Sequence, residues 1–270
     1  MSEAGESGVY EVYATKYAWR PVRRGDLFPT GGGDRSEQIG MDYFVWAAIS
    51  PERTFVIDTG FTAEEAERRG RTPLRRPAEA LALVGVDAES VEDVILTHCH
   101  YDHIGTVDDF PNARLHIQES ELQFASGRYM QNDSIAHSFN AEEVTGLVRD
   151  VFSGRTVLHD GDKELADGLS IHLVGGHTGG NQVVRVRTAR GWVVLASDAA
   201  HYYDQLEDGA LFAIVFDVGR LVRGYERMHE LGDSPEHLVP GHDPRVLQRY
   251  PAPSPDLEGM VARLDVPPKE

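Results

Sequence analysis

Three histidines and one aspartate lie close together in the run Thr97-His98-Cys99-His100-Tyr101-Asp102-His103. Imidazole nitrogens and carboxylate oxygens are the ligands that zinc and similar divalent metals use at hydrolytic sites. The run follows the apolar segment 94–96, which predicts a strand, and Gly105 comes shortly after it. A chance cluster is disfavoured by this context, although the chain has 12 histidines. The H-x-H-x-D-H pattern therefore predicts a metal-binding loop at the end of a strand.

Three further candidate ligands, each directly after an apolar run, are His177, Asp198 and His242. Loops on a rigid scaffold are where functional residues gather, and strand ends that converge at one edge of a sheet can bring distant residues together. Taken alone, each of the three is more often a surface or capping residue. Because they follow the histidine-rich run in order, they indicate one shared site.

With these residues in this order, the chain resembles the metallo-β-lactamase superfamily of hydrolases from about residue 43 to about residue 242. The segment 56–60, Val-Ile-Asp-Thr-Gly, is similar to the strand and turn that precede the family's metal loop. The resemblance implies an α/β fold, a four-layer αββα sandwich with the metal site at one edge of the sheets. The ligands that it implies are His98, His100 and His177 for one metal, Asp102, His103 and His242 for a second, and Asp198 as a bridge. The implied cofactors are two divalent metal ions, zinc first, with iron, manganese or cobalt as alternatives.

Within the superfamily, the chain is most similar to the N-acyl homoserine lactonases and related lactone hydrolases. Its length, the segment 198–200 and the segment 239–243 carry this similarity. The lactamases proper tend to have cysteine at the bridging position, whereas the only cysteine here, Cys99, lies in the metal loop with its side chain expected to turn away. Two positions depart from the lactonase pattern. Gly179-Gly180-Asn181 stands where those enzymes commonly have Pro-Gly-His, and His201 stands where they carry a substrate-binding tyrosine.

The resemblance implies opening of a small cyclic ester, such as an N-acyl homoserine lactone, by attack of a metal-bridging hydroxide. Asp102 is the candidate to move a proton to the leaving oxygen. His201 or Tyr202 is the candidate to donate a hydrogen bond to the developing oxyanion. Asp58 and Thr97 are expected to hydrogen-bond the backs of the ligating imidazoles. The residues leave open hydrolysis of another lactone, a cyclic imide or amide or a thioester, as in glyoxalase II, and a mononuclear iron dioxygenase.

The composition limits the class of partner. The chain has 270 residues, 41% of them hydrophobic, and a net charge of −18, which fits a globular protein that binds a small, non-anionic molecule. Nucleic-acid binding needs a basic surface, and only residues 20–24 and 68–76 form short basic clusters. No apolar run approaches the roughly 18 residues of a membrane span, and the acidic start at 1–6 lacks an apolar signal region. We expect a small-molecule substrate, no nucleic acid, no membrane and a cytoplasmic location, with a homodimer left open.

Hydrophobic patterning predicts the elements that position these residues. The expected strands cover 9–17, 41–49, 54–58, 156–158, 169–174, 182–186 and 192–196. Helices are expected at 77–84 and at 218–231, the second with a core stripe of Val218, Leu221, Val222, Tyr225 and Met228.

The segment 119–151 is mostly helical in pattern, with a polar interruption at 131–134, and it resembles the lactonase insertion that covers the metal site. Its candidate pocket walls are Phe124, Tyr129, Met130 and Phe139. We expect one hydrolase domain over 1–250 and a proline-rich tail over 251–270 that runs extended over the surface.

Overall fold

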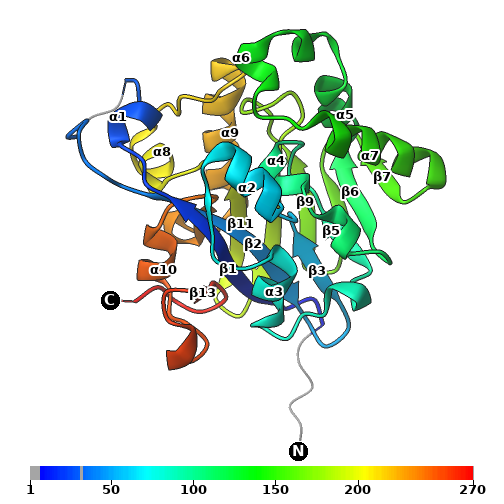
Figure 1. Cartoon of the computed structure of the whole chain (residues 1–270). Helices are drawn as coiled ribbons and strands as arrows, with labels where there is room; N and C mark the ends of the chain where they lie inside the picture. Colours follow the sequence, from blue (N-terminus) through cyan, green and yellow to red (C-terminus); the bar gives the residue numbers. More distant parts are fainter. Residues whose placement is uncertain (1–6, 31–32, 270) are drawn as a thin grey trace, which may run out of the picture.

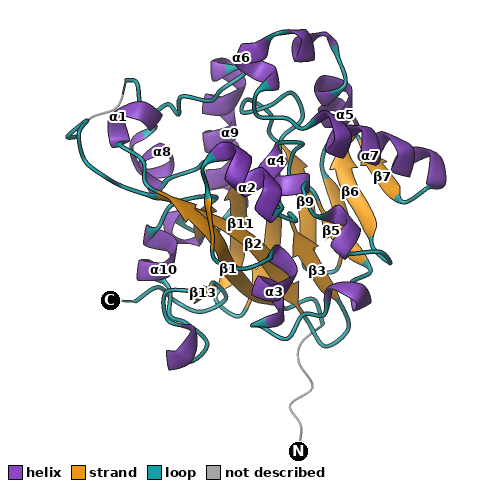
Figure 2. Cartoon of the chain, in the orientation of Figure 1, coloured by secondary structure: helices purple, strands orange, loops and turns teal. Residues whose placement is uncertain are grey.

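Two β-sheets lie face to face at the centre of the molecule, and helices cover their outer faces (Figures 1 and 2). The structure is a computed structural model that describes residues 7–30 and 33–269, so the acidic start of the chain lies outside the described residues. The order of layers is helices, first sheet, second sheet, helices. This order confirms the predicted four-layer αββα sandwich.

The first sheet has eight strands among the described residues, in the order β13-β1-β2-β3-β5-β6-β7 with β4 paired to β1. Their bounds are β1 Glu11–Arg20, β2 Met41–Ile49, β3 Thr54–Ile57, β4 Thr72–Pro73, β5 Asp93–Ile95, β6 Arg114–Gln118, β7 Thr156–His159 and β13 Val261–Arg263. The second sheet has the order β12-β11-β10-β9-β8. Its strands are β8 Lys163–Ala166, β9 Leu169–Leu173, β10 Gln182–Thr188, β11 Gly191–Ser197 and β12 Leu238–Pro240.

The α-helices are short, apart from two. The long ones are α7 Ala141–Ser153 and α9 Val218–Leu231. The others are α1 Arg24–Leu27, α2 Ala63–Arg69, α3 Pro77–Ala82, α4 Tyr101–Ile104, α5 Glu119–Ala125, α6 Asp133–Ala136, α8 Tyr203–Asp208 and α10 Arg245–Arg249. Within the part of the chain that the structure describes, no helix combines the length and the apolar content that a bilayer crossing requires.

Strand β2 shows why the sheets are buried on both faces. Successive side chains of a strand point to opposite faces. Phe44, Trp46 and Ala48 therefore pack in the core between the sheets, while Val45 and Ala47 pack in the core beneath the outer helices. Burial on both sides explains the nearly continuous apolar run that predicted this strand.

The parallel strands bring the candidate ligands to one edge. β3, β5, β6 and β7 run parallel, as do β11 and β12 in the second sheet. Their carboxyl ends are followed by Asp58 after β3, the histidine-rich run after β5, Asp198 after β11 and His242 after β12. This is the edge at which open α/β sheets bind ligands.

The insertion 119–151 forms α5, α6 and α7 above this edge (Figure 1). The polar interruption predicted at 131–134 is shorter than expected. Helix α6 begins inside it, because the side chain of Asn132 accepts a hydrogen bond from the backbone N–H of Ser134 and caps the new helix.

Helix α9 has its predicted bounds, but two residues of the predicted core stripe are not buried. Leu221, Tyr225 and Met228 pack against the second sheet, whereas Val218 and Val222 are 44% and 42% exposed. Successive residues of a helix are rotated by about 100° around its axis. This rotation puts the two valines on the flank of the helix, beside the residues that face the sheet.

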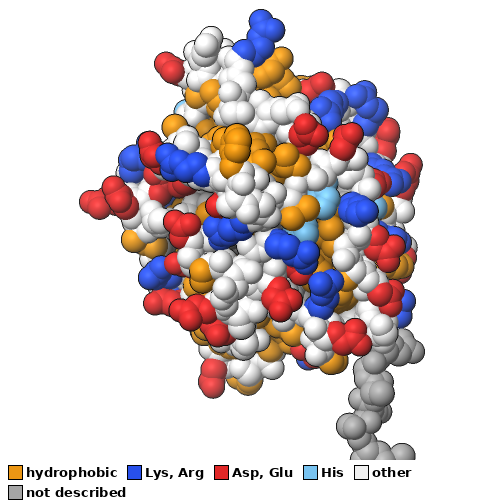
Figure 3. Space-filling model, turned by 90° about the vertical axis from the view of Figure 1, so that its right-hand side faces the viewer, with side chains coloured by type: hydrophobic (Ala, Val, Ile, Leu, Met, Phe, Trp, Pro, Cys, Tyr) orange, Lys and Arg blue, Asp and Glu red, His pale blue; other side chains and the backbone are white. Residues whose placement is uncertain are grey.

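The molecular face that contains α7 and β7 carries acidic and basic side chains in a mixed arrangement (Figure 3). Small apolar areas lie between them on this face. Phe152 of α7 is 91% exposed.

The proline-rich segment 251–270 does not run extended over the surface as its composition predicts. Within it, β13 pairs antiparallel with β1 and forms an edge of the first sheet. Val261, Ala262 and Leu264 are buried, and the backbone N–H of Leu264 donates to the carbonyl of Val12 at 2.7 Å. The prolines therefore bracket a strand that contributes to the core.

Because Leu264 is fully buried in the core between the sheets, Leu264→Ala should lower the free energy of unfolding by roughly 2–5 kcal/mol. Leu74→Ala removes the same atoms from a side chain that is 47% exposed and should change stability by only about 0.5 kcal/mol. Urea unfolding of both variants checks this expectation. Equal, small effects would show that the tail adds nothing to the core.

Candidate metal centre

The seven predicted ligands lie together in two adjoining groups at the sheet edge. His98 and His100 precede α4, Asp102 and His103 lie within it, and the other three residues follow β9, β11 and β12. The first group is His98, His100, His177 and Asp198, and the second is Asp102, His103 and His242. Within each group the ligand atoms lie within 4.8 Å of one another, and all seven side chains are buried.

Asp198 stands between the two groups. Its Oδ2 lies 3.3 Å from Nε2 of His177 and 3.7 Å from Nε2 of His98, which belong to the first group. Its Oδ1 lies 2.9 Å from Nε2 of His242 and 3.4 Å from Nε2 of His103, which belong to the second. One carboxylate oxygen thus faces each group, which is the arrangement that a bridging ligand needs.

The donor atoms fit two divalent cations. Nε2 of His98, Nε2 of His103 and Oδ1 of Asp198 are buried without a hydrogen-bonding partner among residues 7–30 and 33–269. An unsatisfied buried polar atom costs about 1–3 kcal/mol, a cost that a bound cation removes. Burial also lowers the pKa of His100 well below its usual value and that of His177 to about 3, so these imidazoles are neutral and offer lone pairs.

Asp58 and Thr97 support the ligands from behind, as the sequence predicts. The Asp58 carboxylate accepts from the backbone N–H of Thr97 at 2.8 Å and lies 2.7 Å from Nδ1 of His103. The hydroxyl of Thr97 lies 3.1 Å from Nδ1 of His98. Asp58 and Ser197, which precedes the bridging aspartate, have positive φ of 60° and 45°. Non-glycine residues adopt this region rarely, and such strain gathers at functional sites.

Two backbone carbonyls hold other ligands in place, and no local sequence pattern predicts either contact. Nδ1 of His242 lies 2.8 Å from the carbonyl oxygen of Asp42, and Nδ1 of His177 lies 3.1 Å from that of Ile214. A carbonyl can only accept, so each Nδ1 carries the proton and each Nε2 presents its lone pair to the centre.

The family profile of the Metallo-beta-lactamase superfamily matches residues 38–251. This chain belongs to the metallo-beta-lactamase superfamily. The family predicted from the histidine-rich run and the later ligands is thereby confirmed.

Curated relatives of this superfamily member include lactonases. N-acyl homoserine lactonase AttM of Azorhizobium caulinodans is 28% identical over 235 residues, which cover 79% of this chain and 85% of that protein. N-acyl homoserine lactonase AttM of Rhizobium radiobacter is 27% identical over 175 residues, which cover 62% of this chain. The chain spans 63% of the length of that relative.

Solved structures show the same fold. The crystal structure of a quorum-quenching N-acyl homoserine lactone lactonase is similar with a TM-score of 0.71 at 20% identity, covering 87% of this chain and 92% of that one. An N-acyl homoserine lactone hydrolase with the product N-hexanoyl-L-homoserine at its catalytic metal centre also has a TM-score of 0.71 at 20% identity, covering 87% and 94%. At this identity the likeness establishes the fold.

His201 lies against both ligand groups of this metallo-beta-lactamase fold. Its Nε2 is 2.9 Å from Oδ2 of Asp198, and its ring centroid is 4.8 Å from that of His177 and 5.5 Å from that of His242. Phe212 stacks on the ring at 3.6 Å and fixes its plane. Burial lowers the pKa of His201, and the neighbouring carboxylate of Asp198 opposes this shift.

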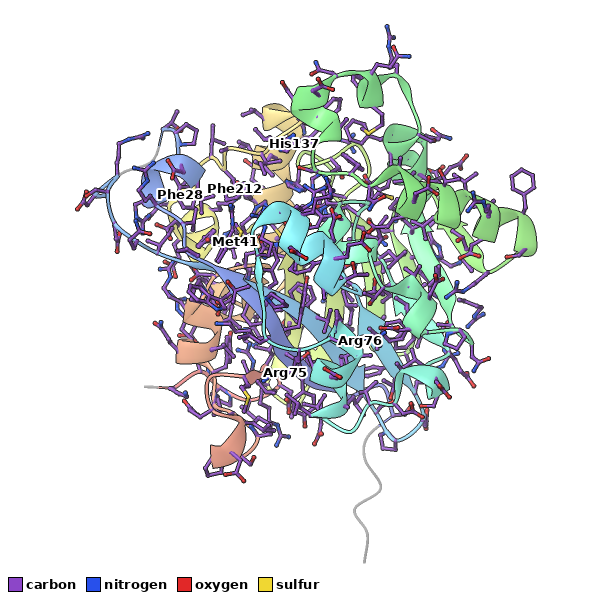
Figure 4. The ribbon with its side chains drawn as sticks, in the orientation of Figure 1. Phe28, Met41, Arg75, Arg76, His137 and Phe212 are labelled. Carbon is purple, nitrogen blue, oxygen red and sulfur yellow. The ribbon has the colours of Figure 1, made fainter. Side chains whose placement is uncertain are left out.

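Tyr202 does not take the substrate-facing position that the sequence analysis considered for it. Its hydroxyl donates to the carbonyl of Gly40 at 2.6 Å, and its ring packs against Phe28 and Phe212. Figure 4 shows the labelled Phe28 and Phe212 close together, and their ring centroids are 6.0 Å apart. The Tyr202 side chain therefore attaches the loop between β11 and α8 to the segment that contains Phe28 and Gly40.

A cavity of about 120 Å³ opens beside His100 and His177. Its aromatic walls are Phe124, Phe139 and Phe216, and the loop 213–215, Ile135 and the rim residues Ser134 and His137 complete it. Two of the four predicted walls, Phe124 and Phe139, thus line the cavity. Tyr129 lies behind them against the Phe216 ring at 4.8 Å, and Met130 packs against the neighbouring apolar core.

Glu121 is a buried residue of the centre that the sequence analysis missed. From α5 its carboxylate accepts three hydrogen bonds, from the backbone N–H of Cys99 at 2.9 Å, the hydroxyl of Thr178 at 2.6 Å and the backbone N–H of Gly180 at 2.8 Å. Cys99 lies between two metal ligands, with its side chain turned into the apolar core. The carboxylate therefore ties the first histidine loop to the loop that carries His177.

Glu121→Gln should weaken metal binding, because an amide replaces one acceptor oxygen with an N–H₂ group that faces donors. Loss of such outer partners typically lowers metal affinity by roughly 10–100-fold. Competition with a chromophoric chelator measures the affinity. Glu119→Gln, on the exposed side of the same helix, should leave it unchanged, and equal affinities for the two variants would contradict the role assigned to Glu121.

Proposed function

We propose that this chain hydrolyses small lactones, with N-acyl homoserine lactones as the leading substrates, at a two-metal centre. The observation that carries the proposal is the position of Asp198, one oxygen toward each ligand group, beside an apolar cavity that opens at His100 and His177. The similarity to curated N-acyl homoserine lactonases supports the choice of substrate. The proposed ligands are the two groups already described, with Asp198 shared between them.

Two bound divalent metals would supply a water of lowered pKa and a Lewis acid for the carbonyl oxygen. The residues of the chain supply the rest. The cavity walls exclude water from the substituent of the substrate and orient its carbonyl toward His100 and His177. To Asp102, whose Oδ2 lies 3.9 Å from Nε2 of His242 in the second group, we assign the transfer of a proton to the leaving oxygen.

His201 is the proposed hydrogen-bond donor to the substrate carbonyl. Its Nδ1 is buried and has no partner among the described residues, so the tautomer with the proton on Nε2 is favoured. This N–H lies 2.9 Å from Oδ2 of Asp198, and a substrate oxygen held beside that carboxylate oxygen would share the donor with it. Stacking on Phe212 fixes the direction in which this N–H points. A donor held in place before the reaction stabilises developing negative charge without reorganisation.

The proposal is tested by incubating zinc-loaded protein with N-hexanoyl homoserine lactone and following the mass of the substrate. We expect enzyme-dependent gain of one water. Asp198→Ala should lose both metal and activity, since it removes the ligand shared by the two groups, whereas Asp208→Ala on the exposed end of α8 should keep both. Retention of two metals without ring opening of any lactone would contradict the proposal and direct attention to thioesters through a thiol-release assay.

His201→Phe retains the aromatic stack on Phe212 and removes the donor, so kcat should fall roughly 10²–10³-fold with metal content unchanged. Tyr202→Phe removes a hydroxyl directed at Gly40 and should leave kcat unchanged. Steady-state kinetics and metal analysis of both variants check this. Loss of metal from His201→Phe would instead identify His201 as a ligand.

A further inference from the structure

The cavity beside the metal centre is small for a pocket that binds an organic ligand. Its volume is about 120 Å³. Pockets that hold drug-sized molecules typically measure roughly 300–1,000 Å³. A substrate whose reactive carbonyl lies at His100 and His177 therefore has room for only a short substituent between the aromatic walls.

Two of the aromatic walls, Phe124 and Phe139, are fixed in place by packing. The ring of Phe139 lies edge-on to that of His100 at 4.6 Å, and Phe124 meets Phe216 at 4.6 Å. Phe124 and Phe139 are 6% and 9% exposed, so neither ring can turn into solvent to enlarge the space.

The metal loop itself brings Phe124 close. A Cβ atom at Gly179 would lie 2.7 Å from both Cβ and Cγ of Phe124, a distance that non-bonded carbon atoms do not adopt. The absence of a side chain at Gly179 thus allows this ring to lie directly against the loop that follows His177. The narrowness of the cavity is in part a consequence of that glycine.

The inner surface favours an apolar substituent. The hydroxyl of Thr178, next to His177, is used by the carboxylate of Glu121. Apart from the ligands His100 and His177, the other polar side chains of the lining are Ser134 and His137, which lie at the rim, where both residues are exposed. His137 is labelled in Figure 4, close to α6.

We infer that Phe124, Phe139 and Phe216 make this centre selective for lactones with a short acyl substituent, such as butanoyl or hexanoyl, over those with a long one, such as dodecanoyl. The inference rests on the proposed lactonase function and adds its substrate range. The part of a long chain that does not fit into the cavity of about 120 Å³ gains no apolar contact from these rings.

The test is to measure kcat/KM of the metal-loaded protein for butanoyl, hexanoyl and dodecanoyl homoserine lactones. One extra or missing methylene group in an apolar pocket changes kcat/KM by roughly 10–200-fold, so the dodecanoyl substrate should be at least about 10-fold poorer than the butanoyl one. Phe139→Ala should raise kcat/KM for the dodecanoyl substrate and reduce the discrimination. Phe216→Ala removes an independent wall and should have the same direction of effect.

Phe152→Ala is the matched control, since it deletes a phenylalanine that is 91% exposed on α7 and should leave the preference unchanged. Equal kcat/KM for the dodecanoyl and butanoyl substrates would overturn the inference, and so would a preference that neither wall variant changes. In both cases the lactones are still opened, so the proposed lactonase function would be retained. No opening at any chain length, with both metals bound, would overturn the proposed function and the chain-length preference with it.

Discussion

The arrangement of the ligands at the edge of the two sheets depends on one buried carboxylate, that of Asp198, which lies between two sets of imidazoles. A buried anion is costly unless it is paired or coordinates a metal. Burial raises the pKa of Asp198, but His201, His242 and His103 lower it more, so the carboxylate is charged where it stands. The surrounding protein is arranged so that one oxygen of this carboxylate faces each ligand group, where bound cations would balance its charge.

The two sheets make that placement possible, because each half of the fold brings ligands to the same edge. Strand β5 delivers the histidine-rich run from the first sheet, and β11 and β12 deliver Asp198 and His242 from the second. Rigid strands fix where each loop begins. Side chains and carbonyls behind the ligands, such as Asp58 and the carbonyl of Asp42, then fix where each imidazole points.

The features predicted from the sequence are those that local spacing encodes. The H-x-H-x-D-H run, the strand β2 and the helix α9 follow from nearby residues, because ligand chemistry and hydrophobic period are local properties. The features that were predicted wrongly or missed depend on contacts between residues that are distant in the sequence. Pairing of 261–263 with β1, the hydroxyl of Tyr202 on Gly40 and the buried carboxylate of Glu121 all join segments far apart in the chain. A glutamate in a polar helical segment has no local pattern that distinguishes it from a solvated one.

Helix α5 links the support of the metal centre to the shape of its cavity. Glu121 and Phe124 lie three residues apart, on the same face of the helix, and both contact the loop after His177. Glycines permit this approach, since a Cβ at Gly180 would lie 2.2 Å from the backbone nitrogen of Glu121. Moving α5 to widen the cavity would therefore also pull the carboxylate away from the metal loops. Substrate range can change at lower cost through Phe139 and Phe216, whose side chains lie outside this hydrogen-bonded connection.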